Sequence, residues 1–174
     1  MFMERSSEIP DAHIADLAQQ FLGTAVLLRE HLPRVVAPSA LAVNAAFAIE
    51  LFIKSLDSHW ECHSLTDELG IDGAYEMTAK SNTRGHDLSD LFAKLPISIR
   101  QGLEAAFAAH ELAQKHESLV AILGLYSCTF ERERYGFEQR AIETTPRHVK
   151  EIVALGEFFA GFVAKMKRVR YWEP

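Results

Sequence analysis

Apolar residues recur at helical spacing along most of this chain. Between Asp11 and Leu32 they return every three or four positions, and Pro33 closes that segment. Ser39 is a suitable N-cap for the next segment, Ala40–Leu56, whose apolar residues point in nearly every direction. A helix that is apolar on most sides is usually central, so we expect several neighbours to pack against Ala40–Leu56.

The helical pattern fails from about His59 to Gly85, where glycines are frequent and large apolar residues are few. We expect a long loop over residues 59–85, with a short hairpin inside it as an alternative. A loop of that length within a small domain is usually either functional or poorly ordered.

Four more helices are predicted after this segment. They run from Leu88 to about Leu95, from about Ser98 to His116, from Ser118 to Phe130 and beyond, and from Pro146 to about Arg170. No internal repeat or linker interrupts the chain, so we expect one domain over residues 1–174. The pattern predicts an all-α fold, an antiparallel up-and-down bundle of about five long helices and one short helix.

Charge and composition narrow the classes of function. The net charge of the 174-residue chain is −6, which argues against a general nucleic-acid coat protein because such proteins need a basic surface. The two cysteines, Cys62 and Cys128, are too few for a disulfide framework. The first ten residues contain no apolar signal core, and no stretch has the length and apolar character of a membrane span. We therefore expect a cytoplasmic protein that does not contact a membrane.

The basic tail "KMKRVRYW" has two interpretations. Its cations, at the C-terminal end of the last expected helix, suit the helix dipole, and this explanation is favoured. The alternative is a local nucleic-acid patch in which Tyr171 and Trp172 stack on bases.

The stretch "TFERERYGFE" (Thr129–Glu138) places an arginine on an apolar face. Continuing the stripe of the Ser118 helix through Phe130 puts Arg134 on the core side, whereas Arg132 points away. A buried guanidinium needs a carboxylate partner, and Glu50 is the best candidate because its helix is otherwise so apolar. The alternative is a surface ion pair between Glu50 and Lys54, four residues apart, with Arg134 extending to water.

His86 and Asp87 allow a structural and a functional explanation. Asp87 is expected to cap the helix that begins at Leu88, which leaves His86 as the residue before the cap. The functional alternative places His86 beside Glu50 and Arg134 in a polar cluster among apolar helices.

A zinc site is a weaker hypothesis. His59, Cys62 and His63 would share one face if the central helix reached that far, but no fourth ligand is evident. The favoured explanation is a helix end anchored by Trp60, and we expect neither a metal nor another cofactor.

Three segments, in this order, resemble HEPN-like proteins, an α-helical superfamily of higher eukaryotes and prokaryotes. The segments are "NAAFAIELFIKSL" (44–56), with Glu50 and Lys54, "GHDLSDLFAKLP" (85–96), with His86 and Asp87, and "FERERYGFE" (130–138), with Arg134 and Tyr135. The resemblance implies a helical bundle that commonly dimerises. Many members belong to toxin–antitoxin or other defence systems, in which active members cut RNA.

The ribonuclease motif of that superfamily, an arginine followed four to six residues later by histidine, is missing here. Arg140 precedes His148 at the wrong spacing, and Pro146 intervenes. We therefore expect a non-enzymatic binding protein that takes a partner protein or a small, nucleotide-like ligand and forms a homodimer. The alternatives are a diverged, metal-independent ribonuclease that uses His86 and Arg134 at a dimer cleft, and a zinc-stabilised structural module.

Overall fold

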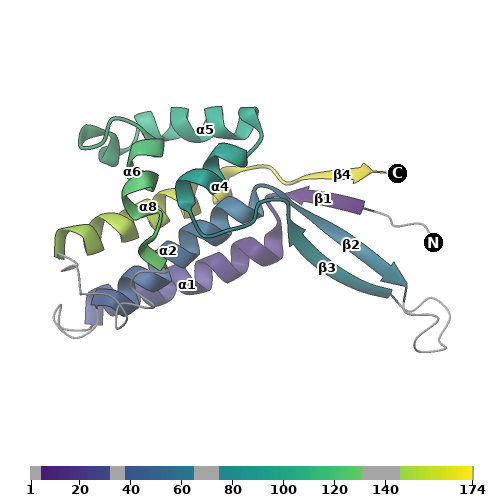
Figure 1. Ribbon diagram of the computed structural model, residues 1–174, viewed down its shortest axis with the longest axis horizontal. Coiled ribbons are helices and arrows are strands. Elements are labelled where there is room, and N and C mark those ends of the chain that lie inside the picture. The colour runs from purple at the N-terminus through teal and green to yellow at the C-terminus, as the bar shows by residue number, and fades with distance from the viewer. Residues whose placement is uncertain (1–4, 32–37, 65–74, 131–145, 174) are drawn as a thin grey trace.

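The computed structural model describes residues 5–31, 38–64, 75–130 and 146–173. Helices form the larger part of it, and the four strands make one sheet (Figure 1). The helices are α1 (Ala12–His31), α2 (Pro38–Ser55), α4 (Leu88–Lys94), α5 (Ile97–Ala108), the 3₁₀ helix η1 (Glu111–Gln114), α6 (Leu119–Tyr126) and α8 (Pro146–Lys165). The prediction of an all-α fold is confirmed in part: the described chain is mostly helical, but it also contains a sheet.

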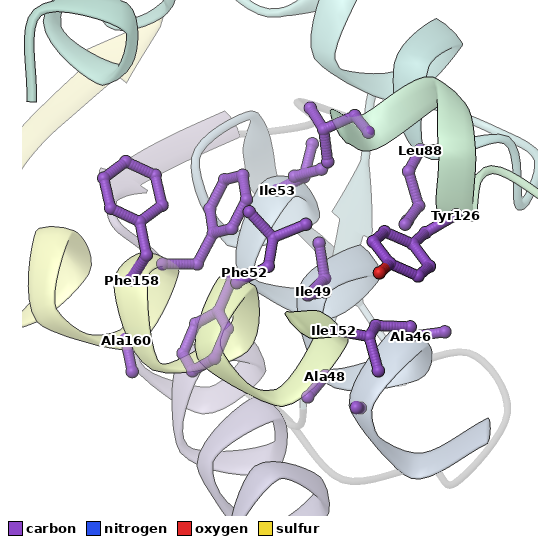
Figure 2. Packing of buried hydrophobic residues seen from close by; sticks show 14 of the residues in the cluster. Ala46, Ala48, Ile49, Phe52, Ile53, Leu88, Tyr126, Ile152, Phe158 and Ala160 are labelled. Atoms are coloured by element: carbon purple, nitrogen blue, oxygen red, sulfur yellow. The ribbon is translucent and has the colours of Figure 1, made fainter. Parts of the chain in front are cut away.

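Helix α2 is the centre of the helical part. It packs against α1, α8 and α4, and its core residues Ile49, Phe52 and Ile53 are completely buried. Figure 2 shows these side chains among residues of α4, α6 and α8, including Leu88, Tyr126, Ile152 and Phe158. The nearly all-round apolar pattern of this segment is therefore explained by neighbours on several sides.

The sheet was not predicted. Its strands are β1 (Arg5–Ile9), β2 (Ser58–Ser64), β3 (Tyr75–Ser81) and β4 (Val169–Glu173), in the order β3-β2-β1-β4 with all neighbours antiparallel. The sheet extends away from the helices, and its first and last strands along the chain, β1 and β4, lie side by side (Figure 1).

Three sequence predictions are corrected by this sheet. The expected loop over residues 59–85 contains the hairpin strands β2 and β3, which is the alternative raised for that segment. Helix α8 ends at Lys165 rather than near Arg170, and the chain continues into β4. The helix-dipole explanation therefore does not apply to Arg170, which lies in a strand together with Tyr171 and Trp172.

The aromatic residues of α8 pack against the core of the chain. Phe158 and Phe159 lie in the core, where Phe158 contacts the ring of Phe107 edge-on. Phe162 packs against the same core. These residues complete the interior of one chain, so they give no reason to expect a second copy on α8.

Candidate functional site

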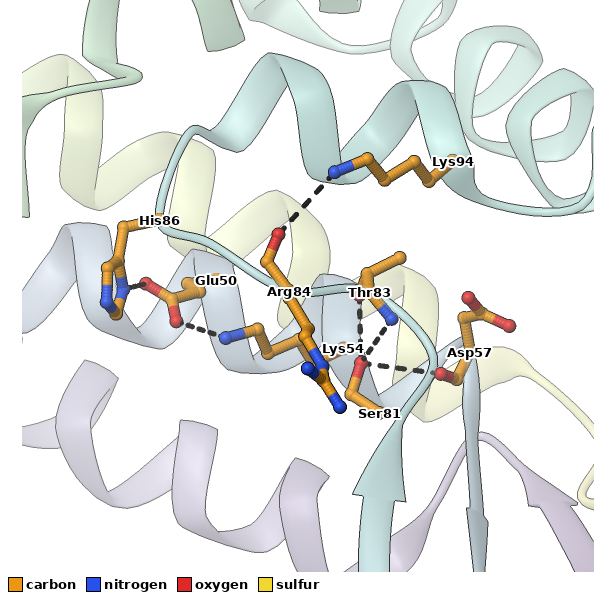
Figure 3. A network of polar contacts seen from close by, with 8 residues as sticks. All are labelled: Glu50, Lys54, Asp57, Ser81, Thr83, Arg84, His86 and Lys94. Atoms are coloured by element: carbon orange, nitrogen blue, oxygen red, sulfur yellow. Dashed lines mark hydrogen bonds and ion pairs between the residues drawn. The ribbon is translucent and has the colours of Figure 1, made fainter.

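The buried carboxylate of Glu50 contacts two nitrogen atoms from other side chains. Glu50, on α2, is 1% exposed. Lys54 Nζ donates to its Oε1 at 2.6 Å, and His86 Nδ1 lies 2.9 Å from its Oε2 (Figure 3). Each carboxylate oxygen therefore has a partner, and Lys54 supplies the opposite charge that a buried carboxylate requires.

Helical spacing explains the Glu50–Lys54 pair, because residues four apart on α2 face the same side. The sequence analysis allowed a Glu50–Lys54 ion pair only as a surface pair. It is instead largely enclosed, since Lys54 is mostly buried as well as Glu50.

The segment before α4 brings His86 to Glu50 from 36 positions away. Gly85 has a φ of +107°, a conformation that residues with a side chain rarely adopt, and it turns the chain immediately before His86. Asp87 then caps α4 as predicted, because its Oδ1 accepts from the Asp90 amide at 3.0 Å.

Asp87 belongs to a separate hydrogen-bonded group that fixes α4 against the end of α6. Its Oδ1 accepts from the hydroxyls of Ser89 at 2.6 Å and Ser127 at 2.8 Å. The Ser89 hydrogen bond, followed by that of the Asp90 amide, lowers the pKa of Asp87. The Asp87 carboxylate therefore stabilises the turn that carries His86.

Aromatic rings hold the imidazole from one side. The His86 ring stacks on Phe130 with centroids 5.2 Å apart, and Phe130 stacks on Phe47 at 5.1 Å. Phe21 meets Phe47 edge-on at 4.6 Å. Sequence analysis had placed Phe130 on a core stripe but had not linked it with His86, because nothing in their spacing joins the two segments.

The contact with Glu50 favours one tautomer of His86. An ionised carboxylate only accepts hydrogen bonds, so the Nδ1 that faces Glu50 carries the hydrogen. In the neutral ring, Nε2 is then an acceptor. The side chain remains 43% exposed, and Nε2 has no hydrogen-bond partner within the described residues. The site therefore presents an oriented imidazole to solvent.

Two further cationic residues, Arg84 and Lys94, lie in the segment of chain that carries His86. Arg84 is exposed, and its guanidinium makes no ion pair with the part of the chain that the structure describes. Lys94 reaches the backbone carbonyl of Arg84 at 3.5 Å (Figure 3). Because Lys54 balances Glu50, Arg84 adds a positive charge to the surface two residues before His86 along the chain.

A second polar group lies deeper in the fold. Tyr126 Oη donates to Glu151 Oε2 at 3.3 Å, and His116 Nε2 lies 3.8 Å from the same oxygen. All three side chains are largely buried. Sequence spacing gave no sign of this group, which joins three separate segments, and its enclosure favours a structural role over contact with a ligand.

The remaining candidates fall elsewhere. Arg134 and Tyr135 lie outside the described residues, so the proposed Glu50–Arg134 pair stays a prediction. His59, Cys62 and His63 lie on strand β2 rather than on a helix, so the helical spacing behind the zinc hypothesis is absent. The His59 ring instead lies 3.2 Å from Glu61 Oε1.

Comparison of the chain with protein-family models, with curated proteins and with solved structures gave no match. Within the described residues, no helix combines the length and apolar character needed to cross a bilayer.

Proposed function

We propose that this chain is a HEPN-like helical protein that binds a small anionic, nucleotide-like ligand at His86 without catalysing a reaction. The single observation that carries the proposal is the exposed imidazole whose inner nitrogen is held by buried Glu50. Such an arrangement presents a polar atom in a fixed direction, which lowers the entropic cost of binding.

The surroundings of His86 suit the chemistry of a nucleotide. Arg84, two residues before His86, is exposed and has no ion pair within the described part of the chain, so it can supply a positive charge for a phosphate group. Phe130 holds the imidazole on one face, and the exposed part of the ring offers a surface on which a base can stack. The HEPN-like bundle, and a role in bacterial stress, defence or toxin–antitoxin systems, rest on the sequence resemblance alone.

Isothermal titration calorimetry with adenosine and guanosine monophosphates, and with inorganic phosphate, tests this proposal. We expect a nucleotide to bind to the wild type, and the affinity to fall at least tenfold in His86→Ala. His31→Ala, which removes an exposed imidazole at the end of α1, is the matched control. Absence of nucleotide binding, or equal binding by His86→Ala, contradicts the proposal.

A diverged ribonuclease is the second candidate, because the Glu50–His86 pair has the geometry of a carboxylate that orients a general base. Incubation with total RNA separates the two functions. The binding proposal predicts intact RNA. Cleavage that is lost in both His86→Ala and Glu50→Gln would favour the ribonuclease.

A further inference from the structure

Strand β3 is an open edge of the sheet. The order β3-β2-β1-β4 leaves β3 with one neighbour among the described strands. Asn82 N donates to Asp57 O at 3.0 Å, which makes this opposed pair a hydrogen-bonded pair of the hairpin. The alternation of antiparallel pairing then turns the main-chain groups of Tyr75, Met77, Ala79 and Ser81 away from β2.

The usual protections of an edge strand are few here. Proteins commonly shield such edges with charged side chains, proline, bulges or very short strands. Of these, β3 carries charged side chains, Glu76 and Lys80. Strand β3 is seven residues long, contains no proline and pairs with β2 without a bulge. Met77 is also 58% exposed on this strand.

We infer that the β3 edge is a docking surface for a second copy of this chain. The observation that selects this partner is the charge pattern of the strand. Antiparallel pairing of two β3 strands about a two-fold axis at Thr78 overlaps all seven residues and places Glu76 opposite Lys80 of the second copy, twice. Opposite charges at directly paired positions stabilise a sheet, and the outward main-chain groups meet in register.

The side chains of this face extend the pairing. Lys80 Nζ already contacts Glu61 Oε2 at 2.5 Å, and the Lys80 side chain is half-exposed. In the dimer it lies between Glu61 and the Glu76 carboxylate of the second copy. Glu76 itself is exposed and has no ion pair within the described residues. On the opposite face, Met77 lies beside Ala79 of the second copy and loses exposed surface.

The other edge of the sheet lacks this complementarity. Pairing two β4 strands about their central residue, Tyr171, places Arg170 opposite Trp172 and Val169 opposite Glu173. No charge pair results. The inference is therefore specific to β3, and it is independent of any ligand at His86.

Sedimentation equilibrium of charge variants tests the inference. We expect the wild type to dimerise, and the dimer to dissociate at least about tenfold more readily in Glu76→Lys and in Lys80→Glu, since each variant opposes like charges twice. An equimolar mixture of the two variants restores opposite charges at every pair, so we expect it to form a heterodimer of near wild-type affinity.

Two variants on the helical surface control for the change in net charge. Glu111→Lys, in η1, matches Glu76→Lys, and Lys150→Glu, in α8, matches Lys80→Glu; both residues are exposed. We expect neither to alter dimerisation. Because Glu76 has no ion pair within the described chain, Glu76→Lys remains informative if Lys80→Glu perturbs the hairpin. A monomeric wild type, unchanged dimerisation in Glu76→Lys, or a mixture that stays monomeric overturns the inference.

Discussion

His86 Nδ1 lies 2.9 Å from a carboxylate oxygen of Glu50, and the two side chains differ sharply in exposure. Glu50 is enclosed by the helical core, whereas a large part of the His86 ring reaches solvent. The carboxylate therefore acts from inside the fold on a group that is available outside it. A change at Glu50 should therefore affect both the stability of the helical core and the orientation of the exposed His86 imidazole.

Removal of the buried carboxylate should be costly. We expect Glu50→Ala to lower the free energy of unfolding by about 3 kcal/mol, because Lys54 would remain mostly buried without its partner. Glu157→Ala is the matched control, since Glu157 pairs with Arg29 at 2.9 Å on an exposed surface. We expect that variant to lose about 0.5 kcal/mol or less. If denaturant melts show that Glu50→Ala and Glu157→Ala lose equal free energy of unfolding, the burial of Glu50 does not strengthen its ion pair.

The helical part of the fold could be predicted because each helix carries its own local signals. Pro38 and Ser39 mark the start of α2, and Asp87 and Pro96 bracket α4. The sheet could not be predicted in the same way, because β1 pairs with β4 from the opposite end of the chain. The segment RSSEI has no alternation of apolar and polar residues that would reveal a strand.

Single residues of the candidate site could be predicted from the sequence, but the contacts between them could not. Glu50 was recognisable as a lone acid on an apolar helix, and His86 as the residue before a cap. Their contact depends on the turn at Gly85 and on the packing of α4 against α2. The aromatic stack of Phe130 on His86 depends also on the packing of α6 against α4, so neither contact is encoded in a local spacing.

The cap of α4 should contribute both stability and a pH dependence. We expect Asp87→Ala to lower the free energy of unfolding by about 1 kcal/mol at neutral pH. The pKa of Asp87 is lowered in the folded chain from its ordinary value of 3.8, chiefly by the Ser89 hydroxyl. Its contribution is therefore complete above that value and is lost as pH falls through the folded pKa.

Denaturant melts of the wild type and of Asp87→Asn, at about pH 6 and about pH 3, measure this contribution. The wild type should lose more stability on acidification than the variant. An identical pH dependence of the two proteins would mean that Asp87 titrates normally in the folded chain.

Glu61, on β2, should titrate far below its usual range. Hydrogen bonds from Lys80 and then from His59 lower its pKa from 4.5 to about 2. Carbon-detected NMR titration of the Glu61 carboxyl should give a midpoint near that value, and Lys80→Met should move the midpoint upward. The stabilising contribution is present above pH 4.5 and is lost as pH falls toward about 2. A wild-type midpoint at the ordinary value would refute the Lys80 contact.

Replacement of two glycines of α8 by alanine should change the free energy of unfolding in opposite directions. A Cβ at Gly156 would lie 2.8 Å from Leu22 Cδ1, in the packed contact between α8 and α1, whereas a Cβ at Gly161 has no neighbour within 4 Å. We expect Gly161→Ala to raise the free energy of unfolding by about 0.5–1 kcal/mol through helix propensity. We expect Gly156→Ala to lower it by about 1 kcal/mol through overpacking. Thermal and denaturant melts that show equal gains would mean that the α1–α8 contact is loose.

The most direct test of the account is the state of the His86 imidazole, followed by nitrogen-15 NMR during a titration with adenosine monophosphate. The account predicts that neutral His86 carries its hydrogen on Nδ1, that Glu50→Gln disturbs this preference, and that the nucleotide shifts the Nε2 resonance of His86 more than that of His31. A hydrogen on Nε2 in the neutral ring, together with an Nε2 resonance that the nucleotide leaves unchanged, would contradict it.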